Sequence, residues 1–221
     1  MQQIRFLLDT LEDPFEMFPM QSVVRSLASL ADESEKNRIE CADPWKSASP
    51  KYYAVEDEHD IEVVELLIGS AFVLGQAAIT QAVSLVKRIH AEADKPSWIP
   101  NGKAQIMEMA APVHYQTGFR KITLINAAAN YYKHRYEWWD DWSGPPSSKP
   151  TIDIVVKLGL VPKAHHNLEH ALRALEIFSR DLSPLGQLIG EWRIQLAKDL
   201  ETKLVDHRLL LARPPEIWDD L

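Results

Sequence analysis

The segment from Asn126 to Glu137 holds the side chains best suited to chemistry in this sequence. It reads Asn-Ala-Ala-Ala-Asn-Tyr-Tyr-Lys-His-Arg-Tyr-Glu, and at 100° per residue most of its polar members fall within one sector of a helix. Apolar and aromatic residues flank this sector on both sides. A solvated helix face is usually wider and richer in Glu and Lys, so the pattern predicts groups held at the mouth of a pocket. We name this sector the polar seam; it consists of Asn126, Asn130, Lys133, His134 and Glu137.

The polar seam resembles the motif of the HEPN superfamily, small helical-bundle domains that include RNA-cleaving toxins and antiviral nucleases. The family motif is an Arg, then four to six residues, then a His, and in the minimal toxin branch a Tyr follows two residues after the His. His134 and Tyr136 match the His-x-Tyr part, and Asn130 and Lys133 lie just upstream. The chain departs from the motif in one respect, because alanines occupy the positions five to seven residues before His134.

The resemblance implies a protein of bacterial defence or toxin-antitoxin type that binds RNA or cleaves it without metal or cofactor. Such cleavage requires a base for the ribose 2′-hydroxyl and a cation for the charged phosphorane. We therefore predict His134, Asn130 and Lys133 as catalytic residues, with Lys133 or Arg135 in place of the missing Arg. The alternative is a non-catalytic protein-protein interaction module in which the imidazole and the amides form hydrogen bonds across helices. The supporting residues in the catalytic interpretation are Asn126, Arg135, Tyr136, Glu137, His166, His170 and Arg173.

A second polar stripe lies between residues 165 and 173, where His166, Glu169, His170 and Arg173 share one helical face. The spacing of His166 and His170 suits one metal ion, and His-x-x-Glu-His is the inverted zinc-protease pattern. That family uses larger α/β domains with a distant third ligand, whereas only 51 residues follow His170. We expect no metal here and favour a solvated or helix-capping cluster. A metal site of another kind, and a composite site in which Arg173 supplies the cation missing from the polar seam, remain as alternatives.

Charge is distributed unevenly along the chain. The 221 residues carry a formal charge of −8, so general attraction to nucleic acid or to an anionic membrane is not expected. Residues 31–65 hold 11 acidic residues against four Lys or Arg, whereas residues 109–136 hold no acidic residue. An anion-binding groove would begin in this acid-free segment, although such a run also arises by chance on a buried helix. Its basic residues and histidines are Arg120, Lys121, Lys133, Arg135, His114 and His134.

Apolar residues recur at helical spacing over long windows, and Gly is scarce at 8 residues. We expect an all-α protein, an up-down bundle of long helices with short loops, at least about 60% helical, whereas about a third is usual. The chain should form a single domain over residues 1–221, with an acidic N-terminal segment to about residue 50 and an extended tail from about residue 212. The predicted helices cover residues 22–37, 54–93, 103–111, 117–142, 162–180 and 184–211.

Cellular location and partners follow from simple features. The single cysteine, Cys41, excludes an intramolecular disulfide, and we identify neither a signal peptide nor a membrane span, so a cytoplasmic protein is expected. The cluster of Trp138, Trp139 and Trp142 beside acidic residues favours packing or a protein partner over nucleic acid. The expected partners are RNA and a protein, either an antitoxin or a second copy. The resemblance adds a homodimer that pairs the His134 regions.

Overall fold

The computed structural model describes residues 1–13, 17–45, 50–138, 141–178 and 181–213. It is 69% helical. The described residues contain no strand, and their one isolated β-bridge joins Val113 to Arg120. The predicted all-α class and the predicted helical share are confirmed.

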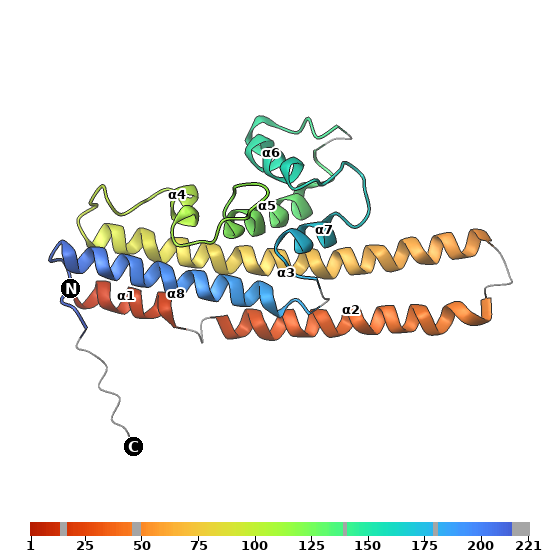
Figure 1. The fold of residues 1–221 in the computed structure, drawn as a ribbon, viewed down its shortest axis with the longest axis horizontal. Coiled ribbons are helices and arrows are strands. Elements are labelled where there is room, and N and C mark those ends of the chain that lie inside the picture. The colour runs from red at the N-terminus through yellow and green to blue at the C-terminus, as the bar shows by residue number, and fades with distance from the viewer. Residues whose placement is uncertain (14–16, 46–49, 139–140, 179–180, 214–221) are drawn as a thin grey trace, which may run out of the picture.

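Four helices run along the long axis of the molecule, and the shorter ones lie together on one side of it (Figure 1). The long group is α1 (Gln2–Glu12), α2 (Phe18–Trp45), α3 (Pro50–Glu92) and α8 (Ser183–Asp206). The short group is α4 (Lys103–Glu108), α5 (Lys121–His134), the 3-10 turn η2 (Pro146–Ser148), α6 (Lys149–Lys157) and α7 (Asn167–Ala174).

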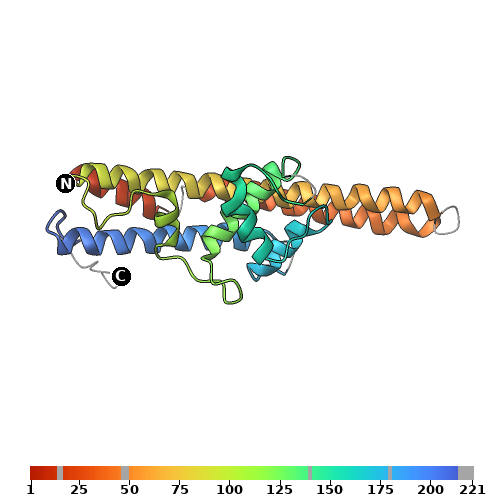
Figure 2. The ribbon, with the colours of Figure 1, turned by 90° about the horizontal axis from the view of Figure 1, so that it is seen from above.

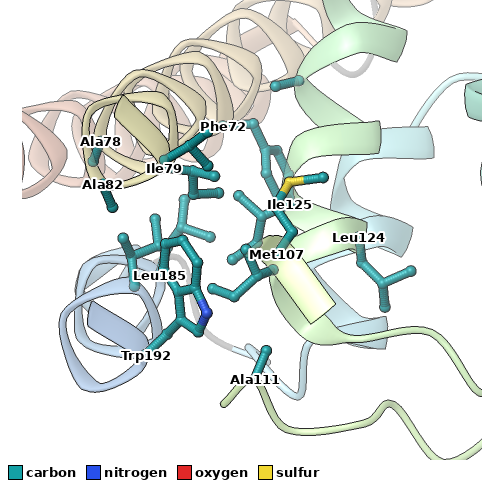
Figure 3. Close-up of a cluster of buried hydrophobic side chains, with 14 of the residues drawn as sticks. Phe72, Ala78, Ile79, Ala82, Met107, Ala111, Leu124, Ile125, Leu185 and Trp192 are labelled. Atoms are coloured by element: carbon teal, nitrogen blue, oxygen red, sulfur yellow. The ribbon is translucent and has the colours of Figure 1, made fainter. Parts of the chain in front are cut away.

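Helix α3 is the central element of the bundle, as its apolar composition predicts. It packs against α1, α2, α4, α5, α7 and α8. Its residues Phe72 and Ile79 are fully buried and meet Ile125 of α5 and Leu185 and Trp192 of α8 in one cluster (Figure 3). A helix that is apolar round most of its circumference needs neighbours on most sides, and α3 has them.

The same apolar character makes part of α3 long and hydrophobic enough to cross a membrane. The segment Glu62–Glu92 has a mean hydropathy of 1.8 in its most apolar window, and 61% of that window is buried inside the protein. Burial against six other helices accounts for this hydropathy, which is compatible with a soluble protein.

Two predicted helices are shorter in the structure. The helix predicted for residues 117–142 spans only Lys121–His134, because the chain turns after His134 and brings Trp138 and Trp142 inward against Tyr131. The helix predicted for residues 162–180 is reduced to Asn167–Ala174. There the Asn167 side chain bonds both the N–H and the carbonyl of Val161, so the preceding residues form a loop held by a side chain rather than a helical turn.

Several other boundaries also differ from the prediction. Helices α1 and α6 were not predicted, yet the inner face of α1 is fully buried at Leu7, Leu8 and Leu11. The predicted segment 22–37 lengthens to Phe18–Trp45, and 54–93 begins earlier, at Pro50. Residues 103–111 and 184–211 end sooner, at Glu108 and Asp206.

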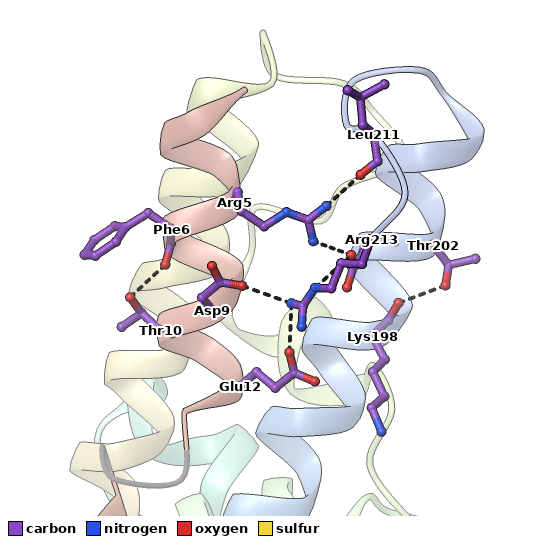
Figure 4. A network of polar contacts seen from close by, with 10 residues as sticks. Arg5, Phe6, Asp9, Thr10, Glu12, Lys198, Thr202, Leu211 and Arg213 are labelled. Atoms are coloured by element: carbon purple, nitrogen blue, oxygen red, sulfur yellow. Dashed lines mark hydrogen bonds and ion pairs between the residues drawn. The ribbon is translucent and has the colours of Figure 1, made fainter. Parts of the chain in front are cut away.

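The predicted extended tail begins with a cluster of ion pairs between the two chain ends (Figure 4). Arg213 contacts Asp9 at 3.0 Å and Glu12 at 2.9 Å on α1, and Glu201 at 3.2 Å on α8. Arg5 also pairs with Glu201. The tail prediction beyond this point, from residue 214 to 221, lies outside the described residues.

Candidate functional site

Three members of the predicted polar seam share one partner, Gln76 of α3. The Gln76 amide nitrogen donates to the side-chain oxygen of Asn126 at 2.9 Å and to that of Asn130 at 2.8 Å. The Gln76 amide oxygen accepts from the Lys133 ammonium at 2.6 Å. Gln76 is 9% exposed, so one buried amide fixes the orientation of three side chains on the facing helix.

In this arrangement the side-chain oxygens of the two asparagines already accept hydrogen bonds from within the protein. With their oxygens bound to Gln76, the half-buried Asn126 and Asn130 keep their NH₂ groups as donors, and these have no partner among the described residues. Lys133 is exposed and retains two N–H donors beyond its bond to Gln76. We name Gln76, Asn126, Asn130 and Lys133 the donor cradle, since a ligand that met it would find hydrogen-bond donors and positive charge.

A further lysine, Lys103, lies within electrostatic range of Lys133 of the donor cradle and of Lys87. Burial lowers the pKa of Lys103, at the start of α4, and the positive charges of Lys133 and Lys87 lower it further. Lys103 therefore extends the positive charge of Lys133 from α5 onto α4.

His134 is the last residue of α5 and lies one turn beyond Asn130. Its Nδ1 is 3.1 Å from a carboxylate oxygen of Glu137, and its side chain is 44% exposed. A carboxylate on Nδ1 orients the ring and leaves Nε2 for a proton acceptor or donor role. In the described part of the chain His134 makes no contact with Gln76, so it lies beside the donor cradle rather than within its network.

A second polar network joins α5 to α7 through Glu65 of α3. One carboxylate oxygen of Glu65 accepts the backbone N–H of Leu168 at 2.9 Å, and the other lies 3.5 Å from Arg135. Glu65 thus caps the N-terminus of α7 from a distant part of the chain. Burial raises the pKa of Glu65, while the Leu168 hydrogen bond and Arg135 partly oppose this shift.

The other basic residues of the acid-free segment are mostly paired with acidic residues from elsewhere. Arg120 lies 3.4 Å from Glu108, and Lys121 contacts Glu176 at 2.5 Å. Arg135 is held by Glu65, and its guanidinium also lies over the ring of Tyr136, which is 86% exposed. Lys133 is thus the member of this segment that adds its positive charge to the donor cradle.

The histidine stripe of α7 faces solvent. His166 pairs with Glu169 at 3.2 Å, and the ring of His170 lies against Gly159. Arg173 is exposed in the last turn of α7, and within the described residues no contact joins it or His170 to the polar seam. The structure therefore does not assemble the composite site, and no group of three His, Cys, Asp or Glu that could hold a metal ion occurs in the described ranges.

Two of the three clustered tryptophans are core residues. Trp138 and Trp142 are 1% and 7% exposed and contact each other and Tyr131. The indole N–H of Trp138 is buried and has no hydrogen-bond partner among the described residues. Trp139 lies outside the described residues. Packing, which the sequence favoured over nucleic-acid stacking, accounts for Trp138 and Trp142.

A groove of about 370 Å³ lies at a different place, where α1, α2 and α8 meet. Its lining includes Arg193, whose buried guanidinium donates to the backbone oxygens of Thr10 and Leu11 and so caps the end of α1. Nothing in the lining extends to the donor cradle. This groove is therefore separate from the donor cradle.

Sequence reasoning missed Gln76, Lys103, Lys87 and Glu65. Gln76 and Glu65 had a usable signal, since each is an isolated polar residue in an otherwise apolar stretch of a helix predicted to be central. The two lysines had none, because surface lysines are common and only packing brings Lys103 within electrostatic range of Lys133 and Lys87.

Comparison with known proteins finds no match to this chain. No family model matches the chain, and neither a curated protein nor a solved structure shows significant similarity to it.

Proposed function

We propose that the protein binds RNA through backbone phosphates at the donor cradle. The observation that carries this proposal is the orientation set by Gln76. Gln76 binds the oxygens of Asn126 and Asn130, and in the described part of the chain no other group accepts from their NH₂ groups. Phosphate oxygens are acceptors only, so they match a surface of amide and ammonium donors.

Local charge supports an anion despite the overall charge of −8. Lys103 lies within electrostatic range of both Lys133 and Lys87, so positive charges gather beside the donor cradle. Lysine contacts to phosphate release bound counterions and give salt-dependent affinity without sequence preference. The expected ligand is single-stranded RNA, in agreement with the RNA-acting family that the polar seam resembles.

Cleavage of the bound RNA is a second candidate, favoured by the pairing of His134 with Glu137. His134 Nε2 would remove the proton from a 2′-hydroxyl, and the resulting alkoxide would attack the adjacent phosphorus. The P–O5′ bond would break as the P–O2′ bond forms, and the leaving 5′-oxygen would take a proton from water, giving a 2′,3′-cyclic phosphate and a 5′-hydroxyl. Lys133 would stabilise the negative charge on the phosphorane. His134→Ala should then reduce cleavage by about 100-fold or more without unfolding the protein, whereas Asn130→Ala should have a milder effect.

Fluorescence anisotropy with a labelled single-stranded RNA tests the binding proposal. Lys133→Ala and Lys103→Ala should each weaken binding and lower the salt slope by about 0.7, the value for one phosphate contact to a single strand. Lys198→Ala is the matched control, an exposed lysine on α8. Competition with inorganic phosphate and with a mononucleotide separates a polymer site from a small-anion site.

The outcomes distinguish the interpretations. Equal losses for Lys198→Ala and Lys133→Ala would show nonspecific attraction and refute the donor cradle as the site. Absence of RNA binding at low salt would leave the interaction module as the function. The homodimer implied by the family resemblance is tested separately by light scattering, in which a monomer at micromolar concentration would contradict it.

A further inference from the structure

The outer halves of α2 and α3 project from the rest of the protein as a two-helix arm (Figures 1 and 2). Helix α8 begins at Ser183, whose neighbour Asp181 interacts electrostatically with Arg25 of α2, and α7 meets α3 at Glu65. Beyond these points neither figure shows another described element beside the hairpin. We name residues 30–45 of α2 and 50–66 of α3 the arm.

Within the arm, each of the two helices has one neighbour among the described elements, the other helix of the hairpin. Globular domains bury a helix against more than one neighbour, and a lone helical hairpin has a small apolar interface. At a rise of about 1.5 Å per residue, the α2 side of the arm extends for roughly 20 Å. The arm is therefore long enough for a third helix to lie alongside α2 and α3.

Exposed apolar side chains lie where the arm leaves the body. Val23 and Leu30 of α2 are 44% and 52% exposed, and the partly buried Leu27 lies between them at helical spacing. On α3, Leu66 is 52% exposed. Leu27 packs against the core, so it is Leu30 and Leu66 that present exposed apolar side chains at the base of the arm.

Charge identifies the kind of partner. Residues 31–65 carry 11 acidic residues against four basic ones, a net −7 that accounts for nearly all of the −8 on the whole chain. Asp32, Glu33 and Glu62 are described and exposed. This charge repels nucleic acid and anionic membranes, and it also opposes pairing with the arm of a second copy.

We propose that the arm docks a basic amphipathic helix of another protein. The apolar face of that helix would cover Leu30 and Leu66, and its Lys or Arg side chains would meet the exposed Asp32, Glu33 and Glu62. This surface is separate from the donor cradle, so the inference does not depend on RNA binding. The protein would then bind a basic helix at the arm and an anionic ligand at the donor cradle.

A pair of designed peptides of 18 residues tests the proposal by fluorescence anisotropy with the full chain. One peptide is an amphipathic helix of Leu and Lys, and the other has Glu at every Lys position. We expect the Lys peptide to bind at least about tenfold more tightly and to weaken as salt increases. Binding of the Glu peptide with equal affinity, or of neither peptide at 100 µM, overturns the proposal.

Two sets of variants locate the binding. The triple substitution Asp32→Asn, Glu33→Gln, Glu62→Gln should weaken the Lys peptide about tenfold, since each exposed charge pair contributes modestly. The control makes the same charge change at exposed positions off the arm, Glu92→Gln, Asp153→Asn and Asp206→Asn, and should change affinity less than twofold. An equal loss in both triples would show bulk attraction and refute the arm as the site.

The apolar contribution is tested by Leu30→Gln with Leu66→Gln, compared with Val156→Gln, a change at a 54% exposed residue of α6. The arm variant should weaken binding several-fold and the control should not. Because these residues are exposed, the melting temperatures of all variants should stay close to that of the wild type. If the Lys peptide binds the arm variant as tightly as it binds the wild type, the proposal is overturned.

Discussion

Gln76→Glu should abolish most of the RNA affinity while leaving the fold intact. The substitution keeps the size of the side chain but replaces the amide nitrogen, which donates to Asn126 and Asn130, by a second carboxylate oxygen. To donate to this oxygen, both Asn amides must rotate by half a turn, which directs their carbonyl oxygens outward. The donor cradle would then present acceptors to a phosphate.

The expected loss of RNA affinity comes from the added charge as well as from the changed orientation of the amides. The new carboxylate pairs with Lys133, whose ammonium lies 2.6 Å from the Gln76 oxygen, and so neutralises one cation of the site. A unit charge about 5.5 Å from a phosphate costs roughly 0.8 to 3 kcal/mol for effective dielectric constants between about 80 and 20. This corresponds to a loss of about 4- to 150-fold in affinity, and the rotated amides add to it.

Anisotropy with single-stranded RNA at low salt measures the effect, with two comparison variants. Gln3→Glu makes the same charge change at an exposed position on α1 and should alter affinity less than twofold. Gln76→Leu removes the orienting amide without adding charge; it should reduce affinity about threefold and stability by about 1–3 kcal/mol, because Lys133 and both Asn lose a partner. If Gln76→Glu binds as tightly as wild type while Lys103→Ala weakens binding, the orientation reasoning is refuted.

Four further predictions concern buried or partly buried polar groups. Glu65→Ala should lower the free energy of unfolding by about 2–4 kcal/mol in urea titrations, because a buried N–H at the start of α7 loses its acceptor. Burial raises the pKa of Glu65 above its ordinary 4.5, so ionisation of this carboxyl in the folded protein is disfavoured. The stability that protonated Glu65 contributes is fully present below pH 4.5 and is lost as pH rises through the raised pKa. Glu65→Gln should remove this decline in stability with pH. The pKa of Lys103 is lowered from 10.5, so the folded protein releases this proton at a lower pH than the unfolded chain does. The free energy of unfolding should therefore rise with pH just below 10.5. Melting temperatures of Lys103→Met measured over this pH range should lack the rise. Trp192→Phe should lower the free energy of unfolding in urea by about 1–2 kcal/mol more than Trp138→Phe does. Both rings are buried, but of the two indoles only that of Trp192 donates a hydrogen bond within the described residues, to the Met109 carbonyl at 2.8 Å. An equal loss in the two variants would contradict this prediction.

The sequence by itself determined the helical class, the central place of α3 and the existence of the polar seam. All three follow from the spacing of apolar and polar residues along one helix, which is a local property of the chain. Helix ends were predicted less well, because they depend on partners far away in sequence. Asn167 bonds Tyr131 and Val161, and Glu65 caps α7, so the loop before α7 replaces a helix that local propensity alone would continue.

Only the tertiary structure decided what the polar seam is available to do. Helical periodicity places Asn126, Asn130 and Lys133 on one face, but it does not specify which of their atoms already have a partner. That partner, Gln76, lies 50 positions before Asn126, and the packing of α3 against α5 brings the two together. A side-chain amide has both a donor end and an acceptor end, so the neighbour that binds one end fixes which end remains for a ligand.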